Sequence, residues 1–428
     1  TQSISGVGHQ PDFTWIKNRS AADDHKLTDA VRGVTNEIES SSGDGEATNA
    51  DGLTAFASDG FSLGDDDEYN TNTENYVSWN WLAGGTAPSK TYVVKVVSDS
   101  GNKYRFDDFG ASTQTVDLQE GGTYTFDQSD SSNSGHPLRF STTSNGSHGG
   151  GSEYTTGVTT SGTPGSAGAY TRITVAASTA TLYYYCTAHS GMGGQANTNS
   201  TYGSSYFDGD IKGTVSANPT AGFSIVNYVP NGTASATIPH GLGVIPDMVF
   251  YKRYNSSSSW FCWTTAIDGS DDYMVLNSTD APAAVSQAGG TTHTSQFIRA
   301  TNYGSGTEVV SYCFASKDAY SSIGSYTGNG SADGPMIVTD FRPALVITKR
   351  TDATGYWGIF DATRAPLNVA AFPALFPNTN DAEVTGTYLD LLSNGFKIRI
   401  DSTHYNADGG TYLYMAFAES PFKYANAR

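Results

Sequence analysis

One pattern occurs three times along the chain and limits its fold more than any other feature. A proline is followed by an apolar run that ends in lysine, at Pro11–Lys17, Pro246–Lys252 and Pro343–Lys349. A closing run rich in aromatic and β-branched residues follows each time, at 76–81, 309–314 and 411–417. Repeats near 100 residues long, built from short runs of this kind, favour β-sandwich modules over a solenoid.

The composition also favours strands over helices. Glycine (48 residues) and tyrosine (26 residues) are frequent, and charged residues make up only 15% of the chain. Such a composition is typical of short strands joined by tight turns. In the closing run at 76–81, Trp79 and Trp81 alternate with polar residues, which predicts sheets with one packed face.

The repeated runs divide the chain into four parts. We expect an all-β protein with module 1 at residues 1–85, an insert at 90–216, module 2 at 219–317 and module 3 at 318–428. The insert contains neither the Pro-to-Lys run nor the closing run, and its short apolar runs predict a Greek-key barrel or sandwich. The stretches 83–90 and 216–222 contain Gly and Pro and are interpreted as linkers.

Module 1 lacks one strand that the other two modules have. Modules 2 and 3 open with apolar runs at 222–228 and 323–326, and each run leads to an Asn-Gly turn signal. Module 1 begins just after the position of that turn. The missing strand would leave a bare sheet edge, so we expect that it lay upstream and was cleaved or disordered, or that a neighbouring subunit supplies it.

The net charge and the apolar content exclude two classes of partner. A formal charge of −19 with no basic cluster disfavours binding to nucleic acid or to anionic lipid. No run of about 18 apolar residues is present, so no membrane insertion is expected. Three cysteines are too few for a disulfide framework in a chain of this length.

The insert carries the most specific chemical motif. Cys186, His189 and Met192 lie on one short segment, and His136 lies fifty residues upstream. Two imidazoles, a thiolate and a weak thioether are the ligands of copper in electron-transfer sites. A buried apolar role for Cys186 is the alternative, and zinc is an alternative metal.

This motif resembles that of the cupredoxins. The stretch 120–126 is similar to the strand before the family's first ligand, Gly135–Leu138 to its histidine-bearing strand, and Tyr184–Met192 to its closing ligand loop in the compact amicyanin-like spacing. The resemblance implies that His136, Cys186 and His189 are strong copper ligands and that Met192 is an axial one. Because the thiol must be deprotonated and the imidazoles neutral, affinity should fall in acid.

Several other motifs are weaker candidates. Gly60–Gly64 matches a nucleophile-elbow pattern, but the matching segment of module 3 favours a strand-entry turn. The acidic clusters 65–68 and 268–272 could supply oxygen ligands to calcium, yet neither has the spacing of a known calcium loop. The pairs Asp29/Arg32 and Asp361/Arg364 favour a structural turn or ion pair over a ligand site.

The two remaining cysteines are expected to be buried thiols. Cys262 and Cys313 align with positions that are mostly apolar in the other modules, and a disulfide between them stays open.

The repeated module resembles modules of virion structural and tail proteins of marine phages, particularly cyanophages. The resemblance rests on the opening 11–19, the Ser58-Asp-Gly-Phe61 turn and the ending 418–423. It implies a non-enzymatic appendage on the virion surface, used for assembly or for attachment to a host glycan or receptor. Its partners would be copies of itself or other virion proteins, and it would be a homo-oligomer.

Two other functions are considered beside this one. An extracellular copper protein that transfers electrons, with the modules as its scaffold, is the alternative. A glycan-cleaving enzyme would need two carboxylates that face each other across a cleft, and no such pair can be chosen from the sequence.

Overall fold

The computed structural model covers residues 1–428 and describes all of them except 199–201, 234–235, 268–271, 285–292, 300–303, 305, 366–370 and 419–428. The described residues form an all-β structure, as expected. Its two α-helices, α1 (Asp67–Asn70) and α2 (Thr403–Asn406), are single turns of four residues, and neither is long enough to span a membrane.

Module 1 consists of two sheets. The larger has the order β5-β4-β3-β2-β8 and the smaller the order β1-β7-β6. Their strands are β1 (Gln2–Ser5), β2 (Phe13–Asn18), β3 (Lys26–Asp29), β4 (Asn36–Glu39), β5 (Ala47–Thr48), β6 (Leu53–Ala57), β7 (Gly60–Leu63) and β8 (Tyr76–Trp81). Ile16 of the larger sheet packs with Leu53 and Phe61 of the smaller one, which makes this part a β-sandwich.

Module 3 repeats this arrangement. Its larger sheet has the order β27-β35-β29-β30, and its smaller sheet β28-β34-β33 matches β1-β7-β6. The strands are β27 (Ser321–Thr327), β28 (Met336–Val338), β29 (Leu345–Arg350), β30 (Trp357–Asp361), β31 (Phe372–Ala374), β32 (Val384–Gly386), β33 (Leu389–Leu392), β34 (Gly395–Ile398) and β35 (Thr411–Phe417).

Module 2 has a larger sheet of seven strands in the order β18-β19-β20-β26-β22-β23-β24, with the pair β21-β25 beside it. The strands are β18 (Ser204–Tyr206), β19 (Gly213–Asn218), β20 (Phe223–Tyr228), β21 (Thr237–Pro239), β22 (Met248–Arg253), β23 (Phe261–Thr264), β24 (Met274–Val275), β25 (Phe297–Arg299) and β26 (Val309–Phe314). The interpretation of 216–222 as a linker is therefore wrong for its first three residues, which belong to β19, and that of 83–90 is wrong for its last two, which begin the strand Ser89–Ser98. The expected insert 90–216 also includes β18 and part of β19, which lie in the sheet of module 2.

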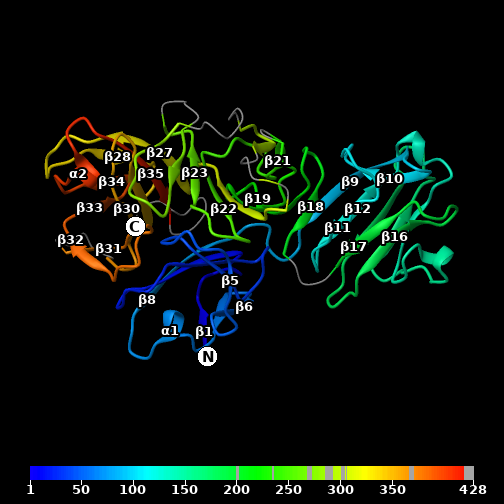
Figure 1. The fold of residues 1–428 in the computed structure, drawn as a ribbon, viewed down its shortest axis with the longest axis horizontal. Helices are drawn as coiled ribbons and strands as arrows, with labels where there is room; N and C mark the ends of the chain where they lie inside the picture. The colour runs from blue at the N-terminus through cyan, green and yellow to red at the C-terminus, as the bar shows by residue number, and fades with distance from the viewer. Residues whose placement is uncertain are drawn as a thin grey trace.

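The insert forms two further sheets at one end of the molecule (Figure 1), with the orders β10-β9-β12-β15-β14 and β11-β17-β16-β13. Its elements are β9 (Ser89–Ser98), β10 (Asn102–Phe106), β11 (Val116–Asp117), β12 (Thr123–Asp127), η1 (Ser131–Asn133), β13 (Leu138–Ser141), η2 (Gly146–Gly149), β14 (Val158–Ser161), β15 (Tyr170–Thr174), β16 (Leu182–Cys186) and β17 (Gly194–Asn197). Tyr92, Phe126 and Leu182 are among the side chains buried between the two sheets.

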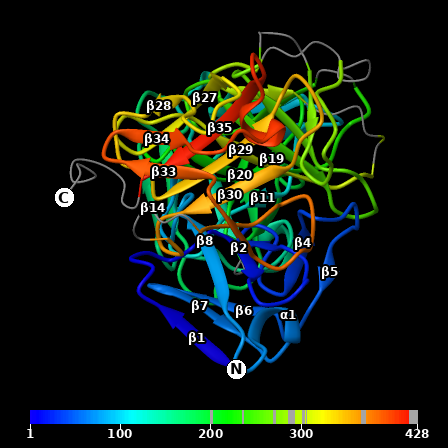
Figure 2. The same ribbon diagram turned by 90° about the vertical axis from the view of Figure 1, so that its left-hand side faces the viewer.

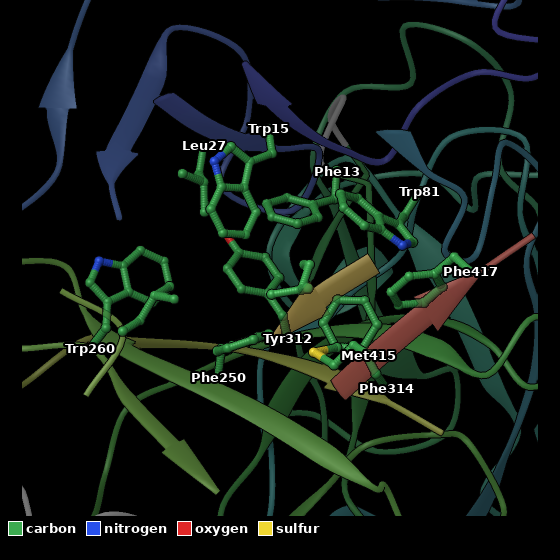
Figure 3. Close-up of a pocket in the computed structure, with 12 residues that line it drawn as sticks. Phe13, Trp15, Leu27, Trp81, Phe250, Trp260, Tyr312, Phe314, Met415 and Phe417 are labelled. Atoms are coloured by element: carbon green, nitrogen blue, oxygen red, sulfur yellow. The ribbon is translucent and has the colours of Figure 1, made fainter. Parts of the chain in front are cut away.

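The three larger module sheets share one core, and this corrects a prediction. Strands β2 and β26 are buried along their whole length, so these sheets pack on both faces and not on one. One face of each larger sheet packs against the smaller sheet of the same module. The other faces the remaining modules (Figure 2), and their apolar side chains form a cluster there that includes Trp15, Phe250 and Met415 (Figure 3).

This shared core holds no ligand pocket. A void of about 10 Å³ lies in it, lined by aromatic and aliphatic side chains of all three modules. That volume is at the lower limit for one water molecule, and an apolar lining offers such a water no partner.

Two equivalent hydrogen bonds join module 2 to module 1 and module 3 to module 2. The indole nitrogen of Trp260 in module 2 donates to the carbonyl of Glu39 in module 1. The matching indole of Trp357 in module 3 donates to the carbonyl of Val275 in module 2. The strand register makes Glu39 and Val275 equivalent. Glu39 pairs with the residue before Leu27, and Val275 pairs with the residue before Cys262, the position that matches Leu27 in module 2.

The repeated Asp/Arg pairs also lie where modules meet. Nε of Arg32 is 2.6 Å from Asp29, and Tyr312 of module 2 donates to the same carboxylate. Arg364 is 2.5 Å from Asp361, which accepts from the indole of Trp79 in module 1. The structural interpretation of these pairs is confirmed, because both residues of each pair are nearly or completely buried and are fully occupied by protein groups.

Candidate metal centre

Strand pairing in the insert brings three predicted ligands together. Cys186 is the last residue of β16, and it pairs with Leu138 at the start of β13. His136 lies two residues before that start, and His189 follows Cys186 by three residues. One donor atom from each lies within 4.8 Å of the others.

The distances between these donors fit a three-coordinate metal. Sγ of Cys186 lies 3.9 Å from Nδ1 of His136 and 3.8 Å from Nδ1 of His189. With metal bonds of about 2.0 Å to nitrogen and about 2.3 Å to sulfur, such separations correspond to angles of about 125–130°, whereas a tetrahedral angle of about 109° would give about 3.5 Å. One thiol and two imidazoles close enough to share an ion are a donor set that suits copper and also zinc.

The site is buried on one side and open on the other. Cys186 is completely buried and His136 is 9% exposed, whereas His189 is exposed to solvent. Burial, and secondarily the neighbouring His189, lowers the pKa of His136. A lowered pKa favours the neutral imidazole that a metal requires.

Met192, the predicted axial ligand, is buried in the same hydrophobic cluster as Cys186. The backbone of this segment is held by β10, because the amide of Tyr104 donates to the carbonyl of Met192. Gly193 allows the segment to return over β16. A Cβ at this position would come within 1.7 Å of the carbonyl oxygen of Tyr184.

Tyr104 also holds the first ligand, a role that no sequence pattern indicated. Its buried hydroxyl donates to the carbonyl of His136 at 2.9 Å, and Gln128 donates to the same oxygen. Burial, and then the neighbouring Cys186, raises the pKa of Tyr104. This residue contacts both ligand-bearing segments and keeps its proton at neutral pH.

Polar contacts fix the ligand rings and the exposed loop. The amide group of Asn102 lies 3.4 Å from Nε2 of His136, on the side of the ring opposite Cys186. The Asn102 atom in this contact is the amide nitrogen, which can only donate, so Nε2 accepts and the proton of the neutral ring lies on Nδ1. Asn145 bonds both Ser190 and the amide of Gly191, and His148 bonds the carbonyl of Cys186.

A second cluster of donors has no room for a metal ion. Carboxylate oxygens of Glu37, Glu39 and Glu68 lie close together. The ammonium group of Lys26 bonds all three, at 3.2, 2.7 and 2.5 Å. It already supplies the positive charge that a cation would bring.

The weaker candidates have structural positions or lie outside the described residues. Ser62 is within strand β7 and not on an elbow before a helix. In the acidic cluster 65–68, Asp66 caps α1 and Glu68 pairs with Lys26. In the cluster 268–272, only Asp272 is described.

The remaining cysteines are free and buried. Cys262 belongs to the core shared by the modules, and Cys313 to the inner core of module 2. They lie on opposite faces of one sheet, so no disulfide joins them.

Comparison with known families gives one match. The family described as Domain of unknown function (DUF7483) matches residues 1–103 and 152–421. The unmatched stretch contains His136, whereas the matched part contains Cys186, His189 and Met192. No curated protein and no solved structure matches the chain. Since the match covers most of its length, the chain belongs to the DUF7483 family.

Proposed function

We propose that the insert binds one copper ion in a site like the type 1 site of the cupredoxins and that the protein transfers electrons through it. His136, Cys186 and His189 would be the strong ligands and Met192 the weak axial one. The observation that carries the proposal is the approach of one thiol and two imidazole nitrogens to within 3.8–3.9 Å across separate segments. A bound copper ion would supply a one-electron couple.

The protein residues would set the properties of that couple. The hydrophobic cluster around Cys186 excludes water from the buried side of the site, which limits reorganisation of the ligands. The exposed ring of His189 gives the centre its contact with solvent and with a redox partner. The hydrogen bonds of Tyr104 and Gln128 hold His136 in place whether or not an ion is bound.

Copper titration of the full chain tests this proposal. We expect one equivalent of Cu(II) to give an intense blue thiolate-to-copper absorption band, and Cys186→Ala to abolish it. Cys262→Ala is the matched control, because it removes a buried thiol that lies outside the site, and it should keep the colour. Binding of zinc with no coloured copper complex would contradict an electron-transfer role.

The role in a phage particle, with attachment to a host glycan or receptor, stays a prediction that rests on the resemblance of the repeated module. Surface location, self-association and calcium binding also stay predictions. In either function, the three modules with their common core would form a rigid support for the insert. Hairpin β18-β19 joins the two parts, since Ser205 bonds Asp117 of the insert while β19 pairs with β20.

A further inference from the structure

The larger sheets of the three modules differ at one edge. In module 2, β26 lies between β22 and β20, and in module 3, β35 lies between β29 and β27. The equivalent strand of module 1, β8, pairs with β2 alone among the described residues. Module 1 therefore has an open edge where its two sister modules have a strand.

The backbone of β8 presents hydrogen-bonding groups along this edge. The carbonyls of Trp81 and Asn75 accept from Asp12 and Arg19 at either end of β2. Because the two sides of a strand alternate in an antiparallel ladder, the N–H and C=O groups of Tyr76, Ser78 and Asn80 point away from β2. An added strand would satisfy these groups.

The sister modules show which strand fits this position. Both β20 and β27 contain the sequence Ser-Ile-x-x-Tyr, at 224–228 and 322–326. Each motif has the same register on its closing strand, as the following pairs show: Ser224↔Cys313, Ile225↔Tyr312 and Tyr228↔Val309 in module 2, and Ser322↔Ala416, Ile323↔Met415 and Tyr326↔Tyr412 in module 3.

Transferred to module 1, this register places the motif on β8. The pairs Trp15↔Trp79, Phe250↔Tyr312 and Ile347↔Met415 make the three closing strands equivalent position by position. The motif's Ser would then lie opposite Asn80, its Ile opposite Trp79 and its Tyr opposite Tyr76. The Ile would extend the shared core, as Ile225 does in module 2.

A side chain on β8 supports the serine position independently. Oδ1 of Asn80 is buried and has no hydrogen-bond partner. A buried acceptor without a donor costs about 1–3 kcal/mol. Both sister strands carry a serine at the position opposite Asn80, and a serine hydroxyl there is a donor of the required kind.

We propose that the open edge of β8 binds an extended segment of another polypeptide chain that carries Ser-Ile-x-x-Tyr, as an added antiparallel strand. Backbone bonds to Tyr76, Ser78 and Asn80 provide the affinity, and the Ser, Ile and Tyr side chains set the register. This interaction surface is independent of the metal centre. A strand in this place gives module 1 the same sheet order as its sisters.

A peptide with the sequence of residues 320–330 tests the proposal in trans on the full chain. We expect the fluorescently labelled peptide to bind with 1:1 stoichiometry by fluorescence anisotropy. A peptide in which the equivalents of Ile323 and Tyr326 are serine should bind at least about tenfold more weakly, a loss of about 1.4 kcal/mol. Hydrogen exchange should slow at the amides of Ser78 and Asn80 when the peptide is added.

A variant of the edge provides the matched comparison. Ser78→Pro removes an N–H that points away from β2, a position where an edge strand tolerates proline, and it should weaken peptide binding at least about tenfold. Ser78→Ala keeps the N–H and should bind normally. The proposal is overturned if the two peptides bind equally well, or if hydrogen exchange slows only at amides outside β8. Dimerisation of the chain through β8, seen as a doubled mass that Ser78→Pro abolishes, also overturns it.

Discussion

The three-module body and the insert both bury polar side chains, but they pair them differently. In the body, the repeated buried arginines meet opposite charges, as Arg32 meets Asp29 and Glu46. In the insert, the donors of His136, Cys186 and His189 face one another at 3.8–3.9 Å without an ion pair among the described residues. Repeated polar residues in the body serve assembly of the modules, whereas the unrepeated ones in the insert have the geometry of a binding site.

The ion pair of module 1 should give the largest effect on stability. In Arg32→Met, the carboxylate of Asp29 stays buried without its main counter-charge. Breaking one side of a buried pair costs about 3–5 kcal/mol. We expect a loss of this size in the free energy of unfolding, measured by urea denaturation with tryptophan fluorescence.

Module 2 offers a natural control for this variant. At the equivalent positions it has Thr264 and Ile267, and module 3 has Met415 in place of the donor Tyr312. A variant with Asp29→Thr, Arg32→Ile, Tyr312→Met and Glu46→Gln recreates that apolar contact and leaves no partner of Arg32 charged. If this multiple variant loses as much stability as Arg32→Met, the unpaired carboxylate of Asp29 is not the cause of the loss. The comparison of body and insert then loses its basis.

Tyr104 tests the other side of the comparison. In Tyr104→Phe, the carbonyl of His136 loses one of its two donors, while the ring keeps its place in the core. Loss of a residue that positions a ligand reduces metal affinity about 10–100-fold. We expect a reduction in this range for Cu(II), measured by competition with a chelator, together with a shift of the blue absorption band.

A comparable hydroxyl of the body provides the control for Tyr104→Phe. Tyr326 of module 3 also donates its buried hydroxyl to a carbonyl, that of Tyr405. Tyr326→Phe should lower the stability by a similar amount and leave copper affinity unchanged. An equal loss of copper affinity in both variants would mean that Tyr104 acts only through general stability.

Local patterns in the sequence predicted the elements but not the way the modules meet. The Pro-to-Lys runs correctly marked β2, β22 and β29, because a short continuous apolar run is typical of a strand that is buried on both faces. The two-residue period in β8 did show one apolar face, that of Trp79 and Trp81. Nothing local shows that this face packs against modules 200 or 300 residues away. The repeated Asp/Arg spacing did identify an ion pair, since both residues lie within one turn.

The metal centre was easier to predict than its support. Cys, His and Met are rare in this chain and cluster within seven residues, so their chemistry is visible in the sequence. Tyr104 and Asn102 are ordinary residues for this composition, and only the pairing of β9 with β10 and the path of the ligand loop bring them to His136. Residue types that are common in a chain give no signal until tertiary structure places them.

The smallest expected effect concerns the lysine that ends each Pro-to-Lys run. Lys17, Lys252 and Lys349 are completely buried, and their ammonium groups donate to backbone carbonyls. Burial lowers the pKa of each to about 8 from 10.5. Three equivalent groups should therefore titrate together in the folded protein.

The sign of the pH effect follows from proton binding. Between about pH 8 and the unfolded pKa of 10.5, the unfolded chain binds more protons than the folded one, so stability rises with pH. Because the ammonium groups keep their hydrogen bonds to carbonyls, we expect a rise of only about 1 kcal/mol from pH 8 to pH 9.5. Urea denaturation across this range measures it, and Lys17→Met should reduce the slope by about a third. A flat or falling profile would show that these lysines are charged in both the folded and the unfolded state. Hydrogen bonds to carbonyls would then be enough to hold a buried charge in the body, whereas the donors of the insert have no such charge to hold.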